Sequence, residues 1–258
     1  MKELNFKLFG QGDPIVILHG MFGMLDNWQL IAKQLAADYM VYAVDLRNHG
    51  RSPHSDEFGY DIMVEDLHHF MEENWLHHAH LIGHSMGGKV AMQFALEYPD
   101  MVDKLVVVDM APKTYEGNHG EIIDALCAMP VEKINNRSEA EDFLRARISG
   151  ESTIQFLLKN LSREKEGGYR WKMNLPVIVK HYQEILAHKA SDAIFEGPTL
   201  FMRGANSDYI EPTEFPSFKK NFSHAQLKTI ADAGHWVHAE QPESFLRVLL
   251  DFLNNDVV

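Results

Sequence analysis

The chain has 258 residues, 45% of them hydrophobic and 24% charged, with a formal net charge of −13 at pH 7. This length and composition indicate one large globular unit with a sizeable buried core. The acidic balance argues against nucleic acid or an anionic membrane as the main partner.

Short apolar runs alternate with amphipathic helical stretches through the first part of the chain. The predicted strands are residues 2–9, 14–18, 41–44, 79–82 and 105–108, and the predicted helices between them are residues 28–37, 60–75 and 88–96. This β-α-β-α order builds a mainly parallel sheet covered by helices, and ligands then bind at the carboxyl ends of the strands. Polar and apolar residues alternate in 2–9, which predicts an antiparallel edge strand.

The alternation stops after Pro112. Residues 113–196 are helical in pattern, polar and interrupted, whereas strands resume at 198–202 and 226–230 and a last helix covers 242–253. Because both ends of this insertion return to the same sheet, we expect a helical cap over the active edge. The predicted division is a core of residues 1–112 and 197–258 and a cap of residues 113–196.

A pentapeptide at residues 83–87 places Ser85 at a strand-to-helix turn, with one glycine two positions before it and another two positions after it. Such a turn holds its central residue in a strained conformation at the edge of the sheet and leaves the hydroxyl exposed. The N-terminus of the following helix can stabilise a developing negative charge. We therefore interpret Ser85 as a nucleophile.

A serine nucleophile needs a base, and the imidazole of histidine is suited to that role near neutral pH. Of the 15 histidines, His235 lies in a loop between the last strand and the last helix, where the base of a Ser-acid-His chain order belongs. His238 is the weaker alternative. Five further histidines between residues 68 and 80 resemble a metal patch, but their spacing is more typical of a solvated face, and we expect no metal site.

Two carboxylates can orient that imidazole. Asp109 directly follows the strand at 105–108, and Asp208 follows the next strand, in the loop that more often holds the acid in such an architecture. There the acid usually comes three residues after the loop glycine, a place that Ser207 takes in this chain. The residue pattern leaves both candidates open.

An oxyanion hole requires two backbone amides. One is expected from Met86, which follows the nucleophile, and the other from Met21, in a loop that leaves a strand. Apolar residues near these loops are candidates for an acyl pocket, and we expect Phe22 and Met110 to contact substrate.

With these residues in place, the chain resembles an α/β-hydrolase over its full length, and within that superfamily the bacterial YbfF-type esterases. The stretches that carry the resemblance are residues 19–23, 45–50, 82–89, 109–112, 154–159, 174–177 and 233–240. The resemblance implies a mostly parallel eight-stranded sheet flanked by helices, with a helical cap after strand six. It also implies that Asp109, not Asp208, is the acid of the triad.

The expected activity is that of a serine carboxylesterase acting on short- to medium-chain acyl esters, through Ser85, His235 and Asp109 and an acyl-enzyme. The resemblance also implies hydrolysis of acyl-CoA thioesters, an activity of some members of the family. A perhydrolase, a lactonase or a carbon–carbon hydrolase can use the same triad, and a non-catalytic receptor can keep the same fold. We expect no cofactor and a small-molecule acyl ester as the partner of a monomer or homodimer.

The compartment is predicted from cysteine usage and the absence of long apolar runs. The one cysteine, Cys127, excludes an internal disulfide and is typical of a reducing compartment. Its apolar surroundings predict that it is buried. Residues 1–6 lack the apolar region of a signal peptide, and no apolar run approaches the ~20 residues that cross a bilayer. We therefore expect a cytoplasmic protein.

Overall fold

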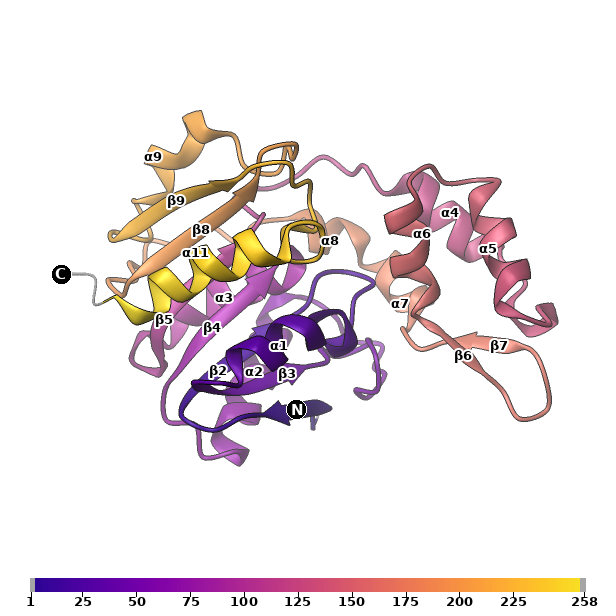
Figure 1. Cartoon of the computed structure of the whole chain (residues 1–258), viewed down its shortest axis with the longest axis horizontal. Helices are drawn as coiled ribbons and strands as arrows, with labels where there is room; N and C mark the ends of the chain where they lie inside the picture. The colour runs from indigo at the N-terminus through magenta and orange to yellow at the C-terminus, as the bar shows by residue number, and fades with distance from the viewer. Residues whose placement is uncertain (1–2, 256–258) are drawn as a thin grey trace.

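The structure is a computed structural model in which residues 3–255 are described, so our strand prediction for Lys2 lies outside the described residues. The strands of the main sheet are Phe6–Phe9 (β1), Asp13–Leu18 (β2), Tyr39–Val44 (β3), Ala79–His84 (β4), Val102–Val108 (β5), Thr199–Gly204 (β8) and Ala225–Ile230 (β9). They lie in the order β1-β3-β2-β4-β5-β8-β9 (Figure 1). β1 pairs antiparallel with β3, as the alternation in 2–9 predicts, although the strand begins only at Phe6. Every other neighbouring pair is parallel.

The strand count implied by the family resemblance is wrong for the described residues. The main sheet has seven strands instead of eight, and the long insertion follows β5, the fifth strand, instead of the sixth. The reason lies in the sequence pattern, because each apolar run that we identified forms one strand and the described chain before β1 contains no further run. The fold class itself is confirmed.

Four longer helices cover the two faces of this sheet: α1 (Gln29–Leu35), α2 (Tyr60–Glu73), α3 (Met86–Glu97) and α11 (Pro242–Asn254). The shorter core helices are α9 (Phe215–Phe218) and α10 (Val237–Glu240), with 3₁₀ turns at Leu25–Trp28, Pro99–Met101 and Pro212–Glu214. Figure 1 shows α11 crossing one face of the sheet with α1 beside it.

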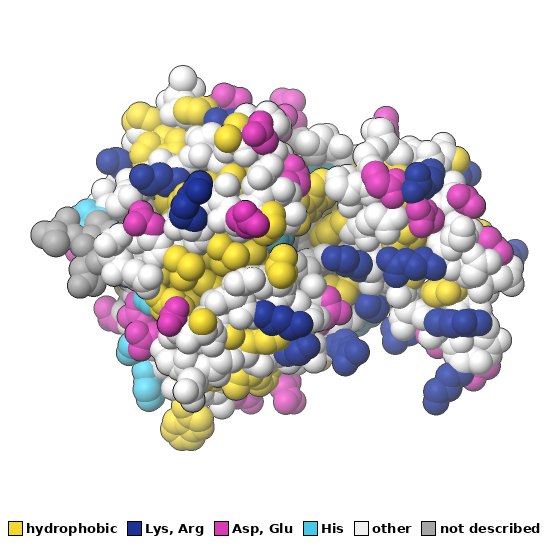
Figure 2. Space-filling model, viewed as in Figure 1, with side chains coloured by type: hydrophobic (Ala, Val, Ile, Leu, Met, Phe, Trp, Pro, Cys, Tyr) yellow, Lys and Arg dark blue, Asp and Glu magenta, His cyan; other side chains and the backbone are white. Residues whose placement is uncertain are grey.

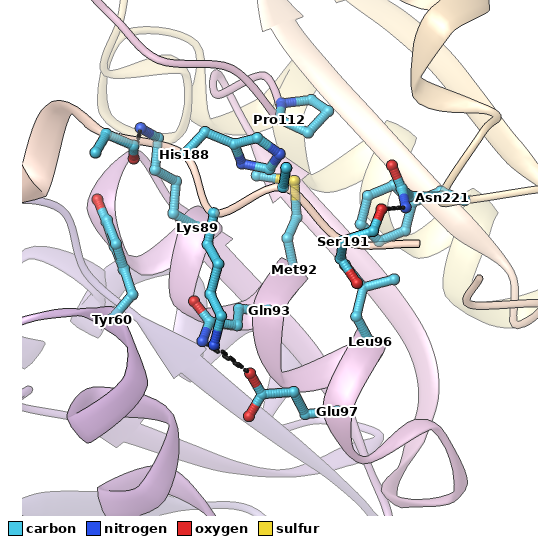
Figure 3. Close-up of a pocket in the computed structure, with 14 residues that line it drawn as sticks. Tyr60, Lys89, Met92, Gln93, Leu96, Glu97, Pro112, His188, Ser191 and Asn221 are labelled. Carbon is cyan, nitrogen blue, oxygen red and sulfur yellow. Dashed lines mark hydrogen bonds and ion pairs between the residues drawn. The ribbon is translucent and has the colours of Figure 1, made fainter. Parts of the chain in front are cut away.

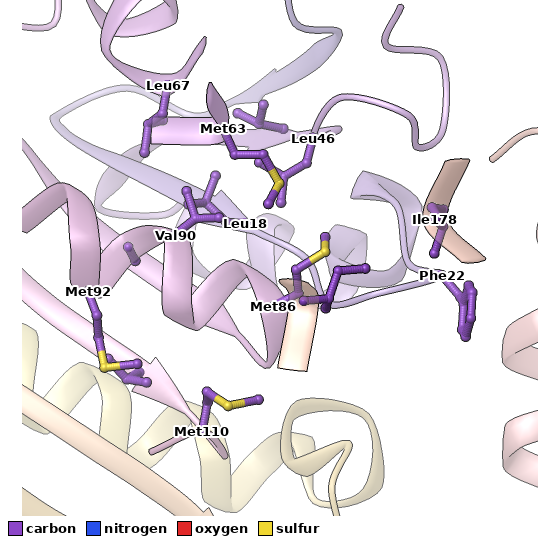
Figure 4. Packing of buried hydrophobic residues seen from close by; sticks show 14 of the residues in the cluster. Leu18, Phe22, Leu46, Met63, Leu67, Met86, Val90, Met92, Met110 and Ile178 are labelled. Carbon is purple, nitrogen blue, oxygen red and sulfur yellow. The ribbon is translucent and has the colours of Figure 1, made fainter. Parts of the chain in front are cut away.

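Alternation along β2 divides the core into two layers. Val16 and Leu18 belong to the cluster that α2 and α3 complete, whereas Ile15 and Ile17 belong to the cluster that α1 and α11 complete. Figure 4 shows the first cluster, in which Leu18 lies among side chains from the helices. Because side chains in a strand point to opposite faces in turn, an uninterrupted apolar run indicates a strand buried on both faces. The core thus holds the carboxyl ends of the parallel strands at one edge.

Residues 113–196, which we call the insert, lie between β5 and β8. The insert contains α4 (Gly120–Ala128), α5 (Arg137–Arg145), α6 (Glu151–Leu158), α7 (Leu175–Lys180), α8 (Tyr182–Leu186), a 3₁₀ turn at Val131–Lys133, and an antiparallel hairpin of β6 (Leu161–Arg163) and β7 (Tyr169–Trp171). In Figure 1 the helices α4 to α7 and this hairpin form a lobe beside the core, and α8 lies against the core. That the insert acts as a cap stays a prediction.

Two details of the insert differ from expectation. The hairpin was missed because its strands have three residues each, too few for a period, although Gly167 and Gly168 at its turn both have positive φ. Cys127 is exposed, so the prediction that it is buried is wrong. The physical reason is helical geometry, because α4 turns Ala125 and Leu126 inward and the next position outward.

Figure 2 shows Lys and Arg side chains gathered on the insert and its junction with the core, although the net charge of the whole chain is negative.

Candidate active site

Ser85 stands between the last residue of β4 and the first of α3, with φ 52° and ψ −119°. A side chain on Ser85 in this region of backbone space is strained, by about 1–3 kcal/mol. The glycines of the pentapeptide make the turn possible. A Cβ atom at Gly83 would lie 2.3 Å from the carbonyl oxygen of Gly87, and one at Gly87 would lie 2.5 Å from that of His19. The strained strand-to-helix turn expected from the sequence is therefore present.

Asp109 follows β5 directly, is completely buried, and contacts His235 from the loop after β9. Nδ1 of His235 lies 2.8 Å from Oδ2 of Asp109. The carboxylate also accepts the backbone N–H of Gly204 at 3.1 Å and the hydroxyl of Ser207. Because the carboxylate holds a proton on Nδ1, Nε2 of the imidazole is left free to accept one.

Asp208, the alternative acid, is exposed and does not contact His235 in the described structure. Ser207 is buried beside it, and its hydroxyl is the one that donates to Asp109. At the position where the acid usually stands, this chain thus has a serine that hydrogen-bonds to the acid of the neighbouring loop. The loop after β8 supplies a hydroxyl donor, and the neighbouring loop supplies the carboxylate.

His238, the alternative base, has a packing role. Its ring stacks on Trp28 with the centroids 3.9 Å apart and an interplanar angle of 7°. Burial, with nearby His235 and Lys159, lowers the pKa of His238 to about 3. Trp28 is correspondingly a core residue and lines neither of the cavities at Ser85.

The imidazole of His235 also stacks on an aromatic ring, Tyr209, which the sequence did not single out. Tyr209 stacks on His235 with the centroids 3.9 Å apart and an interplanar angle of 19°. The Tyr209 hydroxyl lies 3.3 Å from Nε2 of His119, whose Nδ1 lies 2.8 Å from the hydroxyl of Tyr182. Burial lowers the pKa of His119 to about 4 and raises that of Tyr209 to about 12, so both stay neutral. The sequence carries no periodic signal that joins Tyr209, His119 and Tyr182.

Two buried histidines shape the loop at residues 19–23. Nε2 of His19 accepts the Leu46 N–H at 3.0 Å, which leaves Nδ1 to donate to the Gly20 carbonyl at 2.8 Å. Nε2 of His49 accepts the Phe22 N–H at 3.3 Å. Burial lowers the pKa of His19 to about 4 and that of His49 to about 3. Neutral imidazoles are what these acceptor roles require.

The same loop is also contacted by the insert. Phe22 has φ 59°, and its carbonyl accepts the side-chain N–H of Asn160 at 2.7 Å. Asn160 is completely buried and follows α6. This contact, which joins positions 138 residues apart, could not be read from the sequence.

The amides of Met21 and Met86 are the expected oxyanion donors. Met86 is the first residue of α3, where a backbone N–H has no acceptor within its own helix. Within residues 3–255 the Met21 N–H has no hydrogen-bond acceptor either. Both residues line a cavity that Ser85 also lines.

Two cavities meet at Ser85. One, of about 290 Å³, is lined by Met86 and Met110, and the other, of about 220 Å³, by Phe22 and His235. The two residues expected to contact substrate, Phe22 and Met110, thus lie on different sides of the serine. Ser85 and His235 line the same cavity, but in the described structure no hydrogen bond joins them. Catalytic hydrogen bonds often shorten only when substrate is bound.

Neither a metal site nor a membrane span is found in residues 3–255. No group of three or more His, Cys, Asp and Glu side chains there could hold a metal ion. Of the clustered histidines, His68 and His69 face Glu72 and Glu73 on α2, and His78 faces Asp103. No helix in that range has the length and apolar content needed to cross a bilayer.

Comparison with known proteins decides the family. A profile described as the alpha/beta hydrolase fold matches residues 13–125. The esterase YbfF of Escherichia coli is 37% identical over 94% of this chain and 93% of its own. The chain belongs to the α/β-hydrolase family.

Other relatives of this α/β-hydrolase agree. The sn-1-specific diacylglycerol lipase ABHD11 of Danio rerio is 41% identical over 97% of this chain and 82% of its own. A solved structure, a marine microorganism esterase, superposes with a TM-score of 0.95 at 42% identity, covering 98% of this chain and all of that one. The resemblance inferred from the motifs is confirmed, and this α/β-hydrolase is an enzyme of the esterase and lipase kind.

Proposed function

We propose that this enzyme is a serine carboxylesterase that hydrolyses short- to medium-chain acyl esters through Ser85, His235 and Asp109. The observation that carries the proposal is the 2.8 Å contact of Asp109 with His235, in a loop that lines the same cavity as the strained Ser85. Acyl transfer requires a serine hydroxyl and an imidazole oriented by a buried carboxylate in the same cavity.

In the first half-reaction, the Ser85 hydroxyl oxygen bonds to the ester carbonyl carbon while Nε2 of His235 takes its proton. The carbonyl oxygen becomes an oxyanion, which the Met21 and Met86 amides stabilise. The tetrahedral intermediate then expels the alkoxy group, which receives the proton from His235 and leaves as the alcohol. An acyl-Ser85 ester remains.

In the second half-reaction, His235 takes a proton from water, whose oxygen bonds to the acyl carbon. The same amides stabilise the second oxyanion, and Ser85 leaves with the proton returned by His235. Asp109 keeps the imidazole in one tautomer and stabilises its charged form in both halves. Burial keeps the pKa of His19, His49 and His84 low, so these neighbouring imidazoles do not compete for the proton.

The sizes of the cavities support a small substrate. Volumes of about 290 Å³ and 220 Å³ lie at or below the lower end of the ~300–1,000 Å³ range of ligand pockets. Each cavity has apolar lining residues beside its polar ones, among them Met21, Met86 and Met110 in the larger and Phe22, Ile122 and Leu157 in the smaller. These side chains suit an acyl chain on one side of Ser85 and an alcohol on the other. The names of the relatives, an esterase and a diacylglycerol lipase, support an ester as the substrate class.

The test is labelling by a fluorophosphonate together with turnover of p-nitrophenyl butyrate. We expect Ser85→Ala to abolish labelling and to lower kcat by at least ~10⁴-fold, because the nucleophile is lost. Ser217→Ala, an exposed serine on α9, is the matched control and should keep both. Unchanged labelling of Ser85→Ala, or ligand binding without Ser85-dependent turnover, would overturn the proposal.

A further inference from the structure

The two cavities at Ser85 differ in their relation to His235, and this inference rests on the proposed function. His235 lines only the smaller cavity, of about 220 Å³. Because His235 gives its proton to the leaving oxygen, the alcohol must face that side. The acyl chain then enters the cavity of about 290 Å³, lined by Met86 and Met110. We call this the acyl cavity.

Lys89 and Tyr60 form part of the wall of the acyl cavity. Lys89 lies one helical turn after the nucleophile, with its backbone N–H bonded to the Ser85 carbonyl at 3.1 Å. Beyond these two residues lies a second cavity of about 70 Å³, shown in Figure 3, whose lining includes Met92 and Leu96. Lys89 and Tyr60 are the two residues that line both cavities.

Both side chains are fixed in place. Nζ of Lys89 donates to the carbonyls of Leu186 and Ala187, at 2.7 Å each. The Tyr60 hydroxyl donates to the Ile185 carbonyl at 2.6 Å. These carbonyls lie at the end of α8, so the insert anchors both side chains. Lys89 is only 4% exposed, and a buried lysine with its donors satisfied stays ordered.

The aromatic surroundings and the solvation of Lys89 fit the same picture. Its Nζ lies 5.0 Å from the centroid of the Tyr115 ring and 5.7 Å from that of Tyr60. Burial lowers the pKa of Lys89 to about 7. A buried lysine whose Nζ is held by two carbonyls is not a freely moving surface lysine.

We propose that Lys89 and Tyr60 form a partition that closes the acyl cavity and sets the longest acyl chain that the enzyme accepts. With the partition intact, the methylene tail ends at the Lys89 stem. When it is removed, the acyl cavity joins the second cavity, whose Met92, Leu96 and Phe222 side chains suit additional methylene groups.

The test measures kcat/KM for p-nitrophenyl esters from acetate to decanoate. We expect Lys89→Ala to raise the decanoate-to-acetate ratio by ~10-fold or more, because burial of each methylene group favours binding about fourfold. Lys89→Met keeps a side chain of similar length, so its ratio should stay within about twofold of the wild-type value. Tyr60→Ala removes the other half of the partition and should shift the ratio in the same direction as Lys89→Ala.

Lys104 offers a matched control away from the site. Its Nζ also donates to carbonyls at a helix end, those of Leu253 at 2.7 Å and Asn255 at 2.9 Å. Lys104→Ala should therefore lose the same kind of bonds and leave the acyl-length ratio unchanged.

The outcomes separate this inference from the function on which it rests. Equal losses of rate at every chain length in Lys89→Ala and Tyr60→Ala would overturn the partition, even with normal fluorophosphonate labelling. Loss of Ser85-dependent turnover in the wild-type enzyme would overturn the proposed function instead. If Lys89→Ala does not fold, the ratio measured for Tyr60→Ala decides the question.

Discussion

Asp109 and Asp208 follow the neighbouring strands β5 and β8 and lie at the same edge of the sheet, yet their surroundings differ completely. Asp109 is fully buried and accepts hydrogen bonds from His235, Ser207 and the Gly204 backbone. Asp208 is exposed and lines the acyl cavity. The comparison teaches that a loop's place in the fold does not decide which carboxylate orients the base. The direction of each side chain decides it. Asp109 has φ 50°, and the hydroxyl of Ser207 points inward and donates to its carboxylate.

The two nearby imidazoles differ in the same way. His235 is partly exposed, contacts a carboxylate and lines a cavity. His238, three residues later, is buried against Trp28 and has no hydrogen-bond partner for Nδ1 in the described structure. An imidazole that must carry a proton needs a charged partner and access to substrate, whereas one that packs must stay neutral.

The largest effect expected from the carboxylate comparison is that of Asp109→Asn. We expect kcat for p-nitrophenyl butyrate to fall by ~10⁴-fold, because an amide at this position no longer fixes the tautomer of His235. Steady-state kinetics at pH 8 measures it. A similar loss in Asp208→Asn with a mild effect of Asp109→Asn would reverse the assignment.

The imidazole comparison predicts a pH effect on stability. His238 has a folded-state pKa of about 3, below its unfolded value of ~6.5, so its contribution is full above pH 6.5 and is lost as the pH falls toward 3. Between pH 7.5 and pH 5 the free energy of unfolding should fall by about 2 kcal/mol through this group. Urea unfolding of His238→Phe, which keeps a flat ring but does not titrate, should show a loss smaller by that amount. An equal loss in the variant would contradict the prediction.

Ser207→Ala should have a smaller effect on catalysis. The variant removes one of the donors to the buried Asp109 carboxylate, and a hydrogen bond to a charged group contributes about 1.5–3 kcal/mol. Because part of that energy is common to the resting and reacting states, we expect kcat/KM to fall by ~10-fold. Ser217→Ala serves again as the control, and an unchanged rate in Ser207→Ala would show that the hydroxyl is dispensable.

Asp208→Asn is expected to have the smallest effect. The side chain is exposed and does not contact His235, so kcat for p-nitrophenyl butyrate should stay within about threefold of the wild-type value. Measured beside Asp109→Asn, this variant completes the comparison of the two loops.

The core of the fold could be predicted because its signals are local. The apolar run at 14–18 becomes β2, and the pentapeptide at 83–87 becomes the strained turn at Ser85. A strand buried on both faces and a turn between glycines each depend on residues adjacent in sequence. The position of His235 followed from the same order of strands and loops.

The insert and its contacts could not be predicted in this way. Lys89 reaches Leu186 across 97 positions, and Tyr209 reaches His119 across 90. Such contacts have no period, and side chains of this kind are more often exposed than buried. The exposed Cys127 shows the converse, because an apolar neighbourhood along a helix does not tell which face a given position takes.

The hydrogen bond from Asn160 to the Phe22 carbonyl links the insert to the loop at residues 19–23, which is expected to supply an oxyanion donor. Phe22 follows Met21, so the peptide units on both sides of Phe22 are anchored, one to His49 and one to Asn160. A rigid displacement of the segment after α6 must therefore break this bond or carry the peptide with it. A change in the position of the insert would thus reach the peptide beside Met21 through one amide side chain.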